Sequence, residues 1–154
     1  MKKLCLFLIA VLIALPTFSF AGEPLFQYGS LRKNEANVRR GPGTQYPIVW
    51  VYKRYGWPVE ILAEYQSWYK IRDVEGEEGW IYRSLLSSRR TAIVSQGEPI
   101  TMFKKQEGRG PIYKFEAGVI VELIKCGTFQ CNVSYNSKKG WVMKDRLLML
   151  GDVE

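Results

Sequence analysis

Histidine does not occur anywhere in the 154 residues of this chain. It is the usual general base of hydrolases, the partner of a nucleophilic cysteine or serine, and the commonest zinc ligand. Cysteine peptidases and zinc-dependent hydrolases therefore have no candidate residues here. Paired carboxylates or a serine and a lysine could still act, but Glu75, Glu77 and Glu78 lie beside two glycines and have the character of a solvated turn. We expect a protein that is not an enzyme, with no metal site and no cofactor.

Long hydrophobic runs are equally scarce, because the only one extends from Leu4 to Leu15. Two lysines precede it, Pro16 ends it, and Ser19 and Ala21 occupy small-residue cleavage positions, a pattern typical of a secretory signal peptide. A membrane-spanning helix needs about 20 apolar residues, so an anchor is the weaker interpretation. We expect residues 1–21 to be a signal peptide, leaving a periplasmic or secreted protein with no stable membrane insertion after cleavage.

Cysteine is rare, and one of the three residues, Cys5, belongs to the segment expected to be removed. The other two, Cys126 and Cys131, are separated by Gly-Thr-Phe-Gln, which is typical of a hairpin loop. Opposed residues of an antiparallel pair lie within the range that a disulfide spans, and secretion would expose both to an oxidising compartment. A metal site would need further ligands. The pattern predicts a disulfide.

Acidic residues are the minority among the charged side chains, with 15 against 22 lysines and arginines and a formal net charge of +7. Two of the lysines belong to the expected signal peptide, and the remaining charges of both signs are mixed along the chain. A modest and unclustered positive charge does not favour nucleic-acid binding. We expect no nucleic-acid partner.

Two segments of the chain resemble each other. Gly79-Trp80-Ile81 recurs as Gly140-Trp141-Val142, and "GWPVEIL" from Gly56 recurs as "GVIVELI" from Gly118. Self-similarity at a spacing of about 60 residues indicates a tandem repeat. We expect one unit at residues 30–87 and a divergent second unit at residues 91–148.

Apolar residues alternate with polar ones within each unit, as in Val59, Glu60 and Ile61. This period of two predicts short strands, and only "RSLL" from Arg83 suggests a helical turn. A small sheet leaves fewer exposed edges when it curls into a barrel. The sequence therefore predicts an all-β fold of two small barrels.

The opening "NVRRGPGTQYPIV" and the closing "WYKIRDVEGEEGWIYRSLLS" resemble the bacterial SH3 domain family, in a secreted member with two copies. The resemblance implies two tandem SH3-like small β-barrels. It also implies a non-catalytic module that binds peptidoglycan peptides or partner proteins. The second unit has lost the opening motif, because Thr101 to Glu107 replace Asn37 to Gly43.

Aromatic residues are concentrated in the first unit, which has ten where the second has six. Each buries about 150–250 Å² when fully enclosed, and a barrel of this size cannot enclose ten. Some must be exposed, and exposed aromatics beside arginines typically mark recognition surfaces. The glycines and Pro42 serve to hold the loop in shape rather than to bind phosphate. We predict a peptide-binding surface in the first unit, with an arginine pairing a carboxylate, formed by Arg39, Arg40, Tyr46, Trp68, Tyr69 and Tyr82.

The expected ligand is a cell-envelope component, either a peptidoglycan peptide or a peptide segment of another envelope protein. In the second case the protein would be a structural adaptor that never contacts the wall. The second unit is expected to serve mainly as a scaffold.

Overall fold

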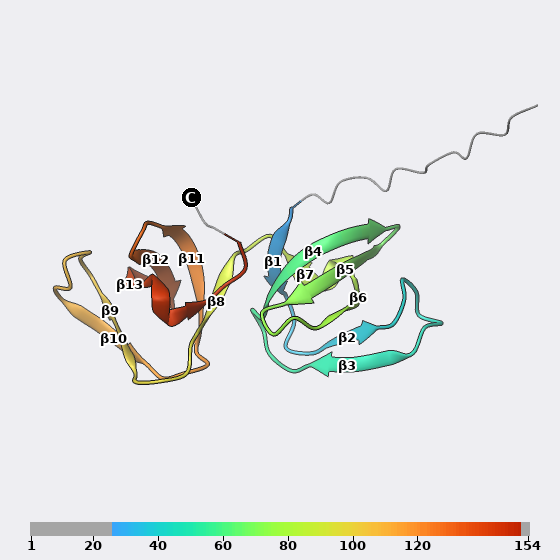
Figure 1. Cartoon of the computed structure of the whole chain (residues 1–154), viewed down its shortest axis with the longest axis horizontal. Coiled ribbons are helices and arrows are strands. Elements are labelled where there is room, and N and C mark those ends of the chain that lie inside the picture. The colour runs from blue at the N-terminus through green and yellow to red at the C-terminus, as the bar shows by residue number, and fades with distance from the viewer. Residues whose placement is uncertain (1–25, 152–154) are drawn as a thin grey trace, which may run out of the picture.

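The computed structural model describes residues 26–151, which form two antiparallel sheets lying side by side (Figure 1). The expected signal peptide, residues 1–21, lies outside the described residues. Within residues 26–151 there is no α-helix, and two short 3₁₀ turns supply the only helical geometry. The all-β fold of two tandem SH3-like barrels is confirmed.

The first sheet has seven strands in the order β3-β2-β6-β5-β4-β1-β7. A 3₁₀ turn, η1 (Arg83–Leu85), forms where the sequence suggested a single helical turn. The strands are β1 (Tyr28–Leu31), β2 (Ala36–Arg39), β3 (Ile48–Tyr52), β4 (Pro58–Tyr65), β5 (Trp68–Asp73), β6 (Glu78–Tyr82) and β7 (Leu86–Ser87).

The second sheet repeats this arrangement, with the order β10-β9-β13-β12-β11-β8-β14. Each strand occupies the place of the strand seven numbers earlier, and η2 (Lys144–Arg146) occupies the place of η1. The two units are thus structural copies. The strands are β8 (Thr91–Val94), β9 (Ile100–Phe103), β10 (Pro111–Phe115), β11 (Ile120–Cys126), β12 (Gln130–Tyr135), β13 (Lys138–Met143) and β14 (Leu147–Leu148).

Each sheet encloses its own core, because the period-two pattern directs alternate side chains inward. In β4 the side chains of Val59 and Ile61 are buried, and Glu60 between them is only half-buried. The core of the first unit consists of Leu31, Ala36, Val38, Val59, Ile61, Tyr69, Ile71, Ile81 and Leu86. An equivalent cluster around Met102, Val121, Val133 and Val142 fills the second unit.

The glycine of each Gly-Trp motif lies where the closing strand crosses a neighbouring strand. A Cβ atom on Gly79 would lie 2.3 Å from Cγ1 of Val38, and one on Gly140 would lie 2.6 Å from Cγ of Met102. These separations are too short for any side chain. The repeated glycine is therefore a steric requirement of the barrel.

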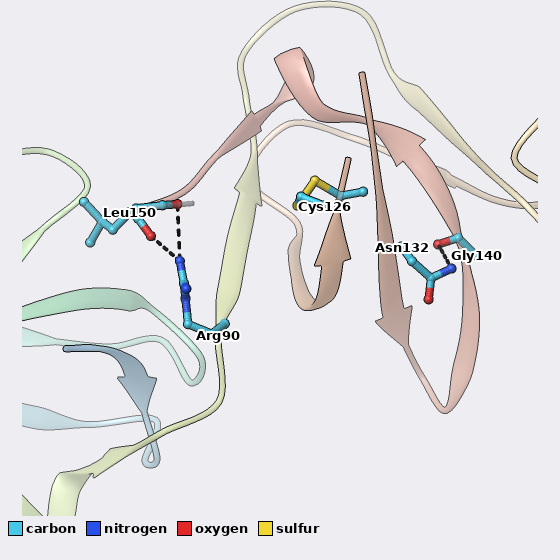
Figure 2. The surroundings of a disulfide bond; sticks show 7 residues. Arg90, Cys126, Asn132, Gly140 and Leu150 are labelled. Atoms are coloured by element: carbon cyan, nitrogen blue, oxygen red, sulfur yellow. Dashed lines mark hydrogen bonds between the residues drawn. A yellow bond between two sulfur atoms is a disulfide. The ribbon is translucent and has the colours of Figure 1, made fainter. Parts of the chain in front are cut away.

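Specific contacts join the two units. Thr91 Oγ1 donates a hydrogen bond to the carbonyl of Gly56 at 2.6 Å, and Arg54 donates to the carbonyl of Gly118 at 2.6 Å. The guanidinium carbon of Arg90 lies 4.6 Å from the ring centroid of Tyr28 in β1. On its other side Arg90 donates to the carbonyl of Leu150 at 2.5 Å, which Figure 2 shows near the disulfide-bearing strands. Arg90 therefore bridges the first strand of one unit and the C-terminal segment of the other.

Candidate ligand-binding site

The loop between β2 and β3 is closed by its own contacts, and it projects from the end of the molecule opposite to the β9–β10 hairpin (Figure 1). Arg39 Nη1 donates to the carbonyl oxygens of Thr44 at 3.1 Å and Tyr46 at 2.7 Å. The ring of Tyr46 lies over Gly41, where an added Cβ atom would come within 2.6 Å of it. The loop thus presents the exposed ring of Tyr46 and the exposed side chain of Arg40, whereas Arg39 holds the loop in shape.

Two of the predicted binding aromatics form a pair on neighbouring strands. Trp68 in β5 and Tyr82 in β6 are opposed in register, and their ring centroids are 5.5 Å apart in an edge-to-face arrangement. Trp68 is 9% exposed and Tyr82 is 45% exposed. The ring of Tyr82 is therefore the accessible one, and the ring of Trp68 packs against it.

Tyr69 is fully buried in the core, so its ring offers no face to a ligand. Its hydroxyl is buried too, and no residue within 26–151 accepts or donates a hydrogen bond to it. Burial raises the pKa of Tyr69, and the nearby charge of Glu64 raises that pKa further, although Arg83 opposes both effects. The hydroxyl stays protonated at neutral pH, and an unsatisfied buried donor costs about 1–3 kcal/mol.

Tyr69 is one of the residues that line a pocket of about 450 Å³. Its lining brings together the end of β6, the η1 turn, the β4–β5 hairpin and the chain around β1. No acidic side chain is among the lining residues, which are Phe26, Arg32, Ser67, Tyr69, Tyr82, Arg83, Ser84 and Leu86. The pocket lining thus combines two arginines and four hydroxyl-bearing side chains with apolar walls.

The structure thus divides the six predicted binding residues into two groups. Tyr69 and Tyr82 line the pocket, and Trp68 packs against Tyr82. Arg39, Arg40 and Tyr46 belong to the β2–β3 loop and are not among the lining residues. Their role in binding stays a prediction.

Sequence reasoning missed the two arginines of the pocket. Arg32 directly follows β1, and Arg83 begins the η1 turn, so both lie outside the period-two pattern that identifies strand faces. The ion pair between Arg83 and Glu64 has a separation of 3.4 Å and leaves the Arg83 side chain half exposed. The sequence signal that could have identified Arg83 is its positive charge directly after the strand that contains the Gly-Trp motif.

Asp73 is a second buried polar group, and its carboxylate is hydrogen-bonded. Its carboxylate accepts hydrogen bonds from the hydroxyl of Tyr52 at 2.8 Å and from Nε1 of Trp57 at 3.3 Å. It also accepts from the backbone N–H groups of Glu75 at 2.9 Å and Glu77 at 3.0 Å. Asp73 therefore organises the acidic turn that the sequence suggested was solvated, and its role is structural.

The second unit shows a different surface. The disulfide between Cys126 and Cys131 is present, with an S–S distance of 2.02 Å, and it links β11 to β12 (Figure 2). Phe129, in the loop that this disulfide closes, is 76% exposed. The second unit therefore also presents an exposed aromatic side chain.

Comparison with known proteins identifies the class of the first unit. Residues 32–88 match the model of the bacterial SH3 domain, and this part of the chain belongs to that family. The expected family is thereby confirmed for the first unit, whereas the second unit is its structural copy by strand order.

A curated relative resembles more of the chain. The putative N-acetylmuramoyl-L-alanine amidase YrvJ of Bacillus subtilis (strain 168) is 29% identical over 153 residues, covering 88% of this chain and 29% of the relative. Two solved structures from Trichomonas vaginalis are also similar. NlpC2 has a TM-score of 0.36 at 15% identity, covering 79% of this chain and 47% of its own. NlpC1 has a TM-score of 0.37 at 13% identity, covering 84% of this chain and 49% of its own. The chain spans less than half the length of each of these proteins.

Proposed function

We propose that this protein is a non-catalytic binding module of the bacterial cell envelope and that its first unit recognises a peptidoglycan peptide. The bacterial SH3 domain at residues 32–88 and the similarity to a putative N-acetylmuramoyl-L-alanine amidase support a role connected with the cell wall. The name of that relative denotes action on the amide bond between an N-acetylmuramoyl group and L-alanine. The proposed site of action is the periplasm or the cell exterior. No helix within residues 26–151 is long and apolar enough to cross a membrane.

The observation that carries the proposal is the position of Tyr82. Its ring is nearly half exposed, it packs edge-to-face on Trp68, and it borders a pocket that contains two arginines. Aromatic anchors supported by a neighbouring ring and placed beside a pocket dominate the binding energy of many recognition surfaces. An extended peptide lying across Tyr82 would place its polar groups near the arginines and the serines.

Co-sedimentation with purified sacculi at moderate salt tests this function. We expect the wild-type protein to be retained and Tyr82→Ala to lose about thirtyfold in affinity, which corresponds to the loss of about 2 kcal/mol at an anchor. Tyr65→Ala is the matched control, because Tyr65 is also an exposed tyrosine of the first unit but does not line the pocket. No retention of the wild-type protein would refute wall binding. We also expect no release of wall fragments, and hydrolysis by a purified, metal-free preparation would contradict the non-catalytic role.

A second candidate function is that of an adaptor which binds another envelope protein, and Phe129 favours it. The disulfide closes its loop, and the carbonyl of Phe129 accepts a hydrogen bond from the N–H of Lys144 at 2.9 Å. A rigid, exposed aromatic of this kind is typical of protein interfaces. If sacculi retain nothing, we expect crosslinking in cells to capture an envelope protein, and Phe129→Ser to abolish that capture.

A further inference from the structure

We propose that the pocket beside Tyr69 binds the free C-terminal carboxylate of a short peptide. This inference rests on the proposed function and deepens it, since it names the chemical group that the first unit recognises. It also assigns recognition of the carboxylate to Arg32 and Arg83 rather than to Arg39 and Arg40.

The hydroxyl of Tyr69 lacks a hydrogen-bond acceptor within residues 26–151. A protonated phenol donates one hydrogen bond. Tyr69 is one of the residues that line the pocket, so the pocket lies next to the residue that carries this buried donor. A ligand atom that enters and satisfies it must be an acceptor.

The charged side chains that line the pocket are all positive. Arg32 and Arg83 both line the pocket, and no lining residue is acidic. Glu64 lies outside the lining and occupies one nitrogen of Arg83 at 3.4 Å, which leaves other N–H groups of that guanidinium available. Guanidinium groups bind carboxylates through paired hydrogen bonds. The acceptor is therefore best supplied by a carboxylate.

Part of the pocket wall is apolar. Phe26, Tyr82 and Leu86 border the same space. These walls suit a small apolar side chain on the residue that carries the carboxylate. A terminal alanine combines both features, whereas an inorganic anion would leave the walls without a contact.

The second unit can be compared with the first at the position of Tyr69, where the two units differ. Glu64 is opposite Tyr69 across β4 and β5, and Cys126 is opposite Cys131 across β11 and β12. The disulfide of the second unit thus occupies the place of the Glu64 and Tyr69 pair.

Two further pocket residues are also replaced in the second unit. Strand register places Met143 where the first unit has Tyr82, because Gln130 is opposite Met143 as Trp68 is opposite Tyr82. The backbone hydrogen bond from Ser95 to Arg146 repeats the one from Arg32 to Leu85, so Ser95 replaces Arg32. The second unit therefore has neither the phenol nor the first arginine, and we assign carboxylate binding to the first unit alone.

The experiment is a titration of the ¹⁵N-labelled protein, followed by NMR, with N-acetyl-alanyl-alanine in its L,L and D,D forms. We expect saturable shifts of the amide signals of Ser67, Tyr82 and Arg83 with at least one form. The C-terminal amide of the same peptide should bind at least about tenfold more weakly, because the charged acceptor is lost. Two further probes test whether any negative charge is sufficient for binding. N-acetyl-aspartyl-alaninamide carries its carboxylate on a side chain, and inorganic phosphate is an anion without a peptide.

Tyr69→Phe is the decisive variant, because it removes only the buried hydroxyl. We expect this variant to resist urea as well as the wild type and yet to bind the free acid at least about tenfold more weakly. Tyr65→Phe, which removes an exposed hydroxyl from the same hairpin, should bind normally. If Tyr69→Phe misfolds, Arg83→Gln tests the same site, and we expect this variant to lose binding as well.

The outcomes separate this inference from the proposed function. Equal binding of acid and amide, a preference for phosphate or for the aspartyl side chain, or unchanged binding by Tyr69→Phe and Arg83→Gln would overturn the inference. Retention on sacculi alongside that result would leave the proposed function intact. Binding of the free acid without retention on sacculi would instead support the pocket and refute the wall as its target.

Discussion

Two buried polar side chains of the first unit, Asp73 and Tyr69, differ in whether they are hydrogen-bonded. Asp73 accepts four hydrogen bonds from Tyr52, Trp57 and two backbone N–H groups, so its desolvation is compensated. Tyr69 has no hydrogen-bond partner within residues 26–151. Asp73 stabilises the barrel, whereas Tyr69 is the residue at which we propose that a ligand supplies the missing hydrogen bond.

Replacement of Asp73 tests its structural role. We expect Asp73→Ala to lower the free energy of unfolding by about 2–4 kcal/mol, because it leaves several buried donors without an acceptor. Urea unfolding followed by tryptophan fluorescence measures the change. Glu75→Ala, in the same turn but exposed, should alter stability by less than about 0.5 kcal/mol. Equal stability of the two variants would contradict the assignment.

Tyr52 makes stability depend on alkaline pH. Burial, together with the hydrogen bond and the charge of Asp73, raises the pKa of Tyr52 well above its ordinary value. The folded state keeps the proton, whereas the unfolded chain releases it above a pH of about 10. The stability contributed by this group is therefore complete below that pH and declines above it, by up to about 1.4 kcal/mol per pH unit.

We expect Tyr52→Phe to make the alkaline decline shallower and to lower stability at pH 7 by about 1 kcal/mol through the lost hydrogen bond. Urea midpoints between pH 7 and pH 11 provide the comparison. A decline of unchanged slope in the variant would show that Tyr52 does not carry this dependence.

At the scale of the element, the β11–β12 hairpin differs from its counterpart β4–β5 by a covalent bond. The disulfide closes a loop of six residues between adjacent strands. We expect replacement of both cysteines by serine to lower the stability of the second unit by roughly 1–3 kcal/mol. Thermal unfolding followed by circular dichroism measures the loss. The amide spectrum of the first unit should remain that of a folded barrel, and its collapse would show that the crosslink supports both units.

The strands were predictable because their signals are local. Alternation in β4 and β5 and the repeated Gly-Trp motif are each contained within a few residues, and the contact of Gly79 with Val38 explains why the motif requires glycine. The Cys126–Cys131 pair was predictable for the same reason. The pocket was not, because its lining comes from separate places in the chain that only the closed barrel brings together.

The predicted site also shows what composition cannot reveal. The aromatic count of the first unit correctly indicated exposed rings, since Tyr46, Tyr55, Tyr65 and Tyr82 are exposed. It could not distinguish these from Trp68 and Tyr69, which are buried. The pattern likewise gave no sign that Arg39 would donate to the carbonyls of its own loop.

At the scale of the molecule, two copies of one fold have different surfaces. The first unit carries the glycine-rich loop, the exposed tyrosines and the pocket, and the second carries the disulfide and the exposed Phe129. Contacts through Arg54, Arg90 and Thr91 join the two units. This asymmetry supports the proposal that recognition belongs to the first unit and that the second unit is chiefly its scaffold.

The most direct test of that proposal is the affinity for purified sacculi of three folded variants measured side by side. Tyr82→Ala and Tyr46→Ala remove exposed rings of the first unit, and Lys139→Ala removes an exposed charge of the second. Trp68→Ala is avoided because Trp68 is nearly buried. We predict that Tyr82→Ala loses about thirtyfold in affinity, that Tyr46→Ala weakens binding measurably, and that Lys139→Ala changes mainly the salt dependence. Loss of binding by Lys139→Ala with both tyrosine variants unaffected would contradict recognition by the first unit.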